Sequence, residues 1–413
     1  MAGWRLDDVI TTEQILKMVS EQRELNFEPG AEHVYCNTGY TLMAETVSRV
    51  TGTAFPEWMT EKVFKPLGMS HTHFHDDHQR IVPNRAYSYQ RDQDEQLKNS
   101  ILSYANVGAT SLFTTAEDLV RWIENLRSGT IGGREITERL LTRGVLNDGT
   151  EIDYAFGISH ADHRGLHGIG HSGGDAGFRT WLQYFPEQDF GVVVLSNLAS
   201  FAPNVVASKI TEIFLGEFME DESGEQSQPQ PHALTRDALQ RFVGRYQVLD
   251  TPVVWTVSLE GGQLHVSSTG LAPAVLTPVS NTGFVMGASG NRVDFESDDD
   301  GCVSGFTATL DGQEFRGVPL DDVPVAELGQ YVGRYYSPEL LTFYSIRLRD
   351  DALRAVHQRH TDVALTPLGE DQFGGDQWWF GRATFSRDQA GQIEGFRLTG
   401  GGVRNLRFER VVE

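Results

Sequence analysis

Cysteine is nearly absent from this sequence of 413 residues, which contains only Cys36 and Cys302. The two residues fall in regions that we assign to different domains. Two cysteines cannot build a disulfide framework, and they cannot supply a zinc site made of several thiolates. We therefore expect no disulfide scaffold and no cysteine-based metal site.

Long hydrophobic runs are absent as well. No apolar stretch approaches the ~20 residues that a membrane-spanning helix needs. The first ten residues, MAGWRLDDVI, lack the basic start, apolar middle and small-residue end of a secretory signal. We expect no membrane partner, and the compartment stays open between cytoplasmic and exported.

Positive charge is scarce. The chain has 34 lysine and arginine residues against 57 aspartate and glutamate residues, giving a formal net charge of −23 and a pI of about 4.9. A field of this sign repels polyanions, so we expect no nucleic-acid partner. We expect a small molecule or a short peptide instead, and the sequence leaves a homo-oligomer open.

The composition of the chain changes at residue 220. Residues 220–231 are acidic, rich in Gln and Pro and free of apolar side chains, which predicts a linker at 220–233. The half after it repeats itself, because FVGRY at 242–246 recurs as YVGRY at 331–335, and two further matches follow at an offset of 89 or 90 residues. Short alternating runs and glycine-rich turns in this half predict two antiparallel β-barrels, at 234–320 and 321–413.

Residues 1–219 mix helical and strand patterns and predict one α/β (α+β) domain. Thr11–Gln14 is a capping box that opens a helix, and residues 70–100 are polar and predict a loop. Further helices are predicted from Tyr40 to Gly52 and over 57–64, 116–126 and 204–218.

A three-strand antiparallel meander is predicted over 166–172, 178–185 and 190–197, with a turn cluster at 186–189. Its first strand carries His171 and Ser172, and Gly173 and Gly174 follow directly. Glycines here let a ligand approach main-chain N–H groups that a side chain would cover. The strand therefore predicts one wall of an active site with a bare backbone edge.

Tyr35 and Asn37 form a Y-x-N triplet just before a predicted helix. A Tyr hydroxyl near a cation can act as a general base, and an Asn amide can hold a substrate carbonyl. The alternatives are a core tyrosine with a helix-capping asparagine, and a buried structural role for His171.

Two other patterns suggest a nucleophile and a metal site, but the sequence around them supports these roles less well. Residues 170–174 fit the G-x-S-x-G nucleophile elbow, but that motif needs a following helix and the pattern after Ser172 predicts a strand. His71, His73, His75 and His78 suggest a metal cluster, against the alternative of a solvated polar loop. We expect no metal and no cofactor.

Four motifs together resemble one family. They are PG…YCNTGY at 29–40, FKPLGM with Thr72 and Phe74 after it, GA…LFTTAEDL at 108–119, and Gly170-His-Ser-Gly173. In order and spacing they resemble the serine β-lactamase and penicillin-binding-protein-like hydrolases over residues 1–218. The His-x-Gly variant and the two repeated barrels are most similar to the D-aminopeptidase branch, peptidase family S12, whose barrels are lipocalin-like.

The resemblance implies a role for each matching residue. Tyr35 would be the general base, and Asn37 would bind substrate. His171 and Gly173 would line the cleft, and Gly174 would give an oxyanion-hole N–H. The family nucleophile and its lysine come from a Ser-x-x-Lys motif on a preceding helix.

That Ser-x-x-Lys motif is absent from this sequence. The five lysines are preceded three positions earlier by Gln14, Met59, Lys62, Glu95 and Val206. The resemblance implies that the chain starts after the nucleophile helix and two sheet strands, which would expose the apolar edge of the strand at 190–197. We expect no acylation by this chain alone.

Two functions remain open. One is a truncated S12-type hydrolase of a small amide, ester or D-amino-acid peptide. The other is a non-catalytic binding protein, or a partner of a chain that supplies the missing segment. A loop at 374–377, before Trp378, would restrict substrates in the first case.

Overall fold

The computed structural model describes residues 1–5, 8–92, 94–101, 105–220, 232–249, 251, 253–268, 271–286, 291–298, 301–310, 313–320 and 325–411. The chain divides into two compact units. We call Trp4–Ser20 with Phe27–Ser223 the helical unit, and Met1–Gly3, Glu21–Asn26 and Gly224–Glu413 the barrel unit. Of the predicted linker, residues 221–231 lie outside the described residues.

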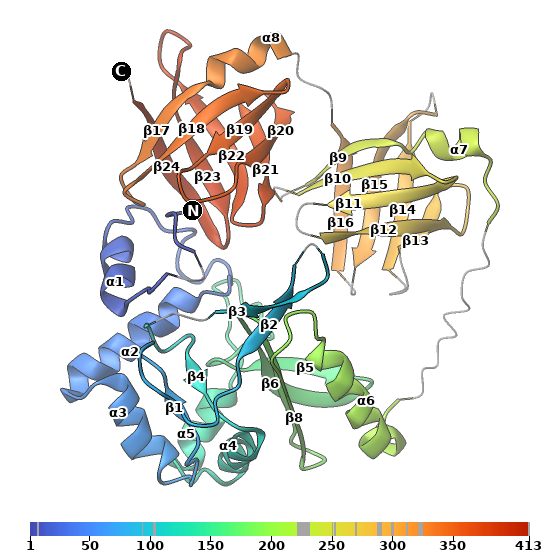
Figure 1. Ribbon diagram of the computed structural model, residues 1–413. Helices are drawn as coiled ribbons and strands as arrows, with labels where there is room; N and C mark the ends of the chain where they lie inside the picture. The colour runs from blue at the N-terminus through green and yellow to red at the C-terminus, as the bar shows by residue number, and fades with distance from the viewer. Residues whose placement is uncertain are drawn as a thin grey trace. The chain divides into compact units, whose positions relative to one another are not determined.

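A four-stranded antiparallel sheet lies in the helical unit (Figure 1). Its order is β5 (Ser159–His163), β6 (Leu166–Asp175), β7 (Phe178–Phe185) and β8 (Phe190–Ser196). The meander predicted from the sequence is β6, β7 and β8, whereas β5 was not predicted. Helix α4 (Ala116–Ser128) contributes Ile123 and Leu126 to the buried cluster that holds Ile169 of β6.

Strand β8 is an edge strand. It pairs with β7 in full register, and no second strand within the described residues pairs with positions 190–196. Helix α6 (Pro203–Leu215) packs beside it, and Phe214 stacks on Phe190 with 5.7 Å between ring centroids. Phe214 nevertheless stays 64% exposed and Leu195 38% exposed. The apolar edge expected at this strand is therefore present.

The helices follow local signals. The capping box is formed, because the Thr11 N–H donates to Gln14 Oε1 at 2.9 Å and the Gln14 N–H donates to Thr11 Oγ1 at 3.3 Å. Gly52, at φ 70°, ends one helix in the left-handed conformation that glycine tolerates. The helices and helical turns not yet named are α1 (Thr12–Ser20), α2 (Asn37–Thr51), α3 (Phe55–Met59), η1 (Thr60–Phe64), α5 (Gly133–Leu141) and η2 (Gly216–Phe218).

The prediction of a loop over 70–100 is wrong in part. Strand β1 (His73–Phe74) pairs with β4 (Leu112–Phe113), and β2 (Ser88–Arg91) pairs with β3 (Leu97–Ser100). These strands have two to four residues each and mostly polar sequences, so they lack a local period. Their pairing depends on partners elsewhere in the chain.

Both predicted barrels are confirmed as closed, eight-stranded and antiparallel. The first consists of β9 (Gly244–Val248), β10 (Val254–Glu260), β11 (Gln263–Ser268), β12 (Leu271–Pro278), β13 (Gly283–Met286), β14 (Asn291–Ser297), β15 (Val303–Leu310) and β16 (Gln313–Pro319). The second consists of β17 (Gly333–Ser337), β18 (Thr342–Arg349), β19 (Ala352–Val356), β20 (Val363–Gly369), β21 (Gln372–Gln377), β22 (Phe380–Arg387), β23 (Ile393–Gly400) and β24 (Val403–Val411). A short helix precedes each barrel, α7 (Arg236–Gln240) and α8 (Val325–Leu328), and the turn η3 (Gly329–Tyr331) follows α8.

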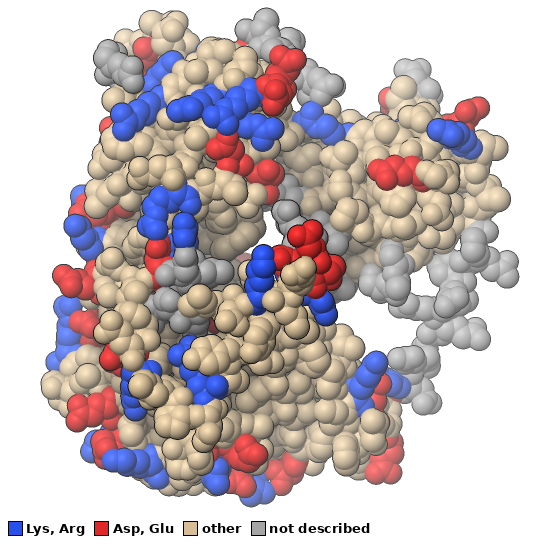
Figure 2. All heavy atoms as spheres, in the orientation of Figure 1, with Lys and Arg blue, Asp and Glu red and all other residues tan. Residues whose placement is uncertain are grey.

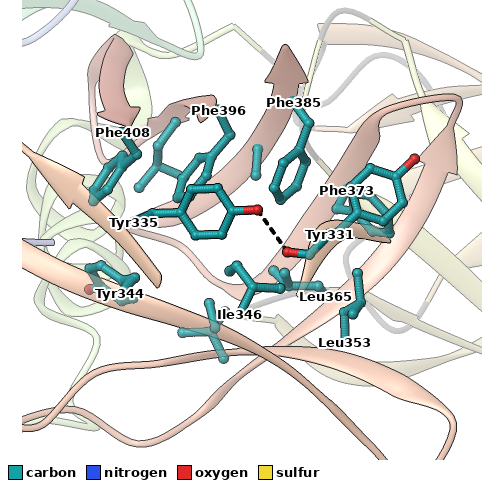
Figure 3. Close-up of a cluster of buried hydrophobic side chains, with 14 of the residues drawn as sticks. Tyr331, Tyr335, Tyr344, Ile346, Leu353, Leu365, Phe373, Phe385, Phe396 and Phe408 are labelled. Carbon is teal, nitrogen blue, oxygen red and sulfur yellow. Dashed lines mark hydrogen bonds between the residues drawn. The ribbon is translucent and has the colours of Figure 1, made fainter. Parts of the chain in front are cut away.

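The sequence repeat has a structural reason. The buried Tyr246 hydroxyl donates to the Phe242 carbonyl at 2.8 Å, and the buried Tyr335 hydroxyl donates to the Tyr331 carbonyl at the same distance. Figure 3 shows the second of these bonds among the aromatic rings that fill the barrel. The FVGRY and YVGRY motifs therefore carry the same tyrosine bond, which fastens each barrel's first strand to the turn before it.

The expected substrate-restricting loop at 374–377 is a strand. Gly374 to Gln377 belong to β21, and the exposed Trp378 lies in the hairpin turn that follows. The glycines fit here because a Cβ at Gly375 would lie 2.0 Å from the Phe380 carbonyl oxygen. These residues serve strand pairing inside the barrel.

The N-terminal segment 21–26 belongs to the barrel unit. Glu339 of the second barrel is buried, and its carboxylate accepts hydrogen bonds from the N–H groups of Arg23 and Arg407. Glu24 pairs with Arg397 at 3.0 Å, and the Asn26 amide donates to the Gly402 carbonyl at 2.8 Å. Residues from the start of the chain thus complete the surface of its last domain.

The surface charge is unevenly placed. Figure 2 shows one face of the molecule, on which basic side chains gather over the second barrel while both signs are mixed elsewhere. Within the described residues, no helix has the length and apolar character that a membrane crossing requires.

Candidate active site

The structure brings Tyr35 and His171 together. Tyr35 immediately precedes the N-cap of α2, and His171 lies in β6. Their ring centroids are 5.9 Å apart with the planes tilted by 38°. Tyr35 is 52% exposed, so it is no core tyrosine, and its hydroxyl makes no hydrogen bond within the described part of the chain.

Asn37 is the first residue of α2, and Cys36 takes the N-cap position without a side-chain bond. The alternative of a helix-capping asparagine is therefore wrong. The Asn37 side chain is exposed, and no hydrogen bond to its amide is found among the described residues. Tyr35 and Asn37 both present free polar groups at the start of one helix.

The backbone of β6 is open beside His171. Strand β5 pairs with β6 only from Leu166 to Gly170. From His171 to Asp175, β6 has β7 on one side and no strand of the described chain on the other. Gly173 and Gly174 lie on this open stretch, and a Cβ at Gly173 would lie 2.2 Å from Thr180 Oγ1. The bare backbone edge expected from the sequence is present at these glycines.

Ser172 does not lie in a nucleophile elbow. It is an exposed residue inside β6, paired with Trp181, and the chain continues into strand β7 rather than a helix. Its carbonyl oxygen lies 2.5 Å from His171 Nδ1. The contribution of Ser172 to the local structure comes from its backbone.

Tyr154 belongs to this cluster, although no sequence motif selects it. Its hydroxyl lies 3.0 Å from His171 Nε2, and its ring meets Tyr35 edge-on at 6.1 Å between centroids. Burial raises the pKa of Tyr154 and of Tyr40, so both hydroxyls stay protonated. The one sequence signal nearby is Gly157, which has a φ of 75° and lacks the Cβ that would crowd the Tyr40 ring.

Asp175 marks the far end of the open stretch of β6. The Thr110 hydroxyl donates a hydrogen bond to its carboxylate. Burial raises the pKa of Asp175, and the Thr110 bond, the Ala176 N–H and the charge of Arg179 offset part of that shift.

The histidines at 71–78 form a different arrangement from a metal cluster. His73 Nε2 lies 3.4 Å from His75 Nδ1, and the buried His75 stacks on Phe113 with 4.4 Å between centroids. Burial, chiefly, lowers the pKa of both imidazoles. Within the described residues, no group of three or more His, Cys, Asp or Glu side chains could hold a metal ion.

Comparison with known proteins identifies a family model and several relatives that this chain matches. The family model described as Beta-lactamase matches residues 2–211. Penicillin-binding protein 4* of Bacillus subtilis is 25% identical over 336 residues, covering 77% of this chain and 73% of that protein. A D-aminopeptidase of Cereibacter sphaeroides is 25% identical over 355 residues, covering 85% of this chain.

The match spans 63% of that D-aminopeptidase's length, which is less than two thirds. Among solved structures, the octameric penicillin-binding protein homologue from Pyrococcus abyssi is similar with a TM-score of 0.49 and 17% identity, covering 87% of this chain and 71% of that one.

Proposed function

The chain belongs to the β-lactamase family, and from this membership we propose that it carries the tyrosine and histidine half of an acyl-transfer site. The substrate is a small amide, an ester or a D-amino-acid peptide, as in a D-aminopeptidase. The observation that carries the proposal is the 5.9 Å approach of Tyr35 to His171 beside the open edge of β6.

Each residue has a role in this proposal. Tyr35, with its hydroxyl free, is the general base, and Asn37 holds the substrate carbonyl or amide. His171 and Gly173 line the ligand position along β6. The Gly174 N–H stabilises the oxyanion of the tetrahedral intermediate, a contribution of roughly 3–4 kcal/mol for one such donor.

The attacking hydroxyl comes from outside this sequence, which contains no Ser-x-x-Lys. We therefore expect the 413-residue chain to give no covalent adduct with a fluorophosphonate or a β-lactam probe. Intact-mass spectrometry after incubation checks this, and a stoichiometric adduct at any serine would overturn it.

The full reaction is tested on a longer protein. If the DNA immediately upstream of the Met1 codon encodes an in-frame Ser-x-x-Lys, that longer protein is expressed and assayed on D-amino-acid amides, short-chain esters and β-lactams. Tyr35→Phe should lower its kcat/KM by about 10²–10⁴-fold, the usual contribution of a positioned base. The matched control, Tyr87→Phe, removes the hydroxyl of an exposed tyrosine and should leave kcat/KM unchanged. Equal activity of the Tyr35→Phe variant and the parent would refute the role of Tyr35.

The second candidate is a non-catalytic binding protein or one part of a two-chain enzyme. The absence of Ser-x-x-Lys favours it. Non-coding or unrelated sequence upstream of Met1, together with saturable binding of D-alaninamide to the chain measured by calorimetry, would support this candidate over the first.

A further inference from the structure

Tyr154 connects the two segments of the candidate site, and neither its sequence position nor the proposed chemistry assigns it a role. We propose that Tyr154 is a positioning residue: it holds neutral His171 with its proton on Nδ1 and fixes the imidazole from a segment outside β6. The inference goes beyond the proposed function, because it concerns the protonation pattern of the resting site and requires no turnover.

Nδ1 of His171 lies 2.5 Å from the carbonyl oxygen of Ser172. A carbonyl oxygen only accepts hydrogen bonds, so Nδ1 must carry the hydrogen. In the neutral imidazole the lone pair is then on Nε2.

The Tyr154 hydroxyl lies 3.0 Å from Nε2 of His171, within hydrogen-bond distance. Since Nε2 holds the lone pair, Tyr154 is the donor. This bond comes from the segment between α5 and β5, so it fixes the ring from outside its own strand.

Tyr154 also contacts Tyr35. The two rings meet edge-on with 6.1 Å between centroids, and the Tyr35 ring lies 5.9 Å from that of His171. Tyr154 therefore lies against both the residue before the N-cap of α2 and the strand that carries Gly173 and Gly174.

A chemical consequence follows for the site. Both nitrogens of His171 are engaged, so the imidazole has no free lone pair with which to take a proton from a ligand on β6. Tyr35, whose hydroxyl has no partner within the described residues, is the base that remains. His171 instead serves as a fixed part of the wall beside the open backbone.

The test reads the tautomer directly by NMR on the 413-residue chain labelled with ¹⁵N-histidine. Long-range ¹H–¹⁵N correlations are recorded at about pH 8.5, some two units above the ordinary imidazole pKa. A His171→Gln variant assigns the signals. We expect the parent to show the His171 proton on Nδ1, and Tyr154→Phe to shift the Nε2 resonance toward that of a free lone pair and to add the Nε2–H form.

A matched control variant makes the test specific. Tyr87→Phe removes a hydroxyl from an exposed tyrosine elsewhere and should leave the His171 signals in place.

A proton on Nε2 in the parent would overturn the proposal, as would a folded Tyr154→Phe protein whose His171 signals match the parent. None of these outcomes depends on acyl transfer, so failure here leaves the probe-labelling and kinetic tests of the proposed function unaffected.

Discussion

One buried carboxylate explains two of the sequence motifs that carry the family resemblance. Asp118 is fully buried, and its carboxylate accepts hydrogen bonds from the His71 N–H, the Thr72 hydroxyl and the Arg121 guanidinium at 2.7–2.8 Å. Thr72 and the AEDL run at 116–119 are therefore joined in one structural bond network, away from Tyr35 and His171.

Asp118→Ala should lower the free energy of unfolding by about 3 kcal/mol, because it leaves a buried hydroxyl and a backbone N–H without an acceptor. Urea unfolding followed by circular dichroism measures the change. Glu117→Ala, on the exposed side of the same helical turn, should cost less than about 0.5 kcal/mol. Equal losses in the two variants would show that Asp118 is not the anchor.

Asp175 should make stability depend on pH in a defined direction. Burial raises its folded-state pKa above the unfolded value, so ionisation of the carboxyl penalises the folded state. The penalty is complete above the folded pKa and disappears as the pH falls below the unfolded value of 3.8. Asp175→Asn should therefore stabilise the protein at pH 7 relative to the parent, with a smaller gain at pH 4.

Thermal unfolding at the two pH values measures this difference, and Glu187→Gln, in the exposed turn between β7 and β8, serves as the control. A gain that is equal at both pH values, or a loss that grows with pH, would contradict the assigned pKa direction.

At the scale of elements, the sequence predicted the helices and strands whose own residues show a hydrophobic period. Residues 178–185 were predicted as a strand and are β7 to the residue, because an apolar run is bounded by a turn cluster. Strand β5 and helix α5 were missed, and β1 to β4 were assigned to a loop or left out, because short polar segments take their structure from distant partners. Tyr154 was missed for the same reason: its bond to His171 depends on how the segment after α5 lies against β6.

The repeated tyrosine bond offers a test on matched elements. Tyr246→Phe and Tyr335→Phe each remove a buried hydroxyl that donates to a carbonyl four residues earlier, and each should lower stability by about 1 kcal/mol. Tyr336→Phe, whose hydroxyl makes no hydrogen bond among the described residues, should be neutral. Unfolding curves in urea would contradict the assignment if Tyr336→Phe were as damaging as Tyr335→Phe.

For the molecule as a whole, the unpaired edge of β8 favours association between chains in solution. An uncharged strand without an outer partner among the described residues, next to the exposed Phe214, is a template for pairing between chains. We expect concentration-dependent association that Leu195→Lys reduces, since a charge on an edge strand opposes such pairing. Light scattering after size-exclusion chromatography measures the mass, and identical masses for parent and variant at all concentrations would dismiss the edge as the cause.

During biosynthesis, residues 21–26 can bond to the second barrel only after that barrel has been translated. Glu24 and Arg397 are 373 positions apart, so at roughly 5–20 residues per second the ribosome releases the arginine some 20 to 75 seconds after the glutamate. During that interval Glu24 lacks its partner, while the intervening sheet and the first barrel are being made. The second barrel thus secures residues 21–26, and the Glu339 carboxylate gains its bond from the Arg407 N–H only after residue 407 has been translated.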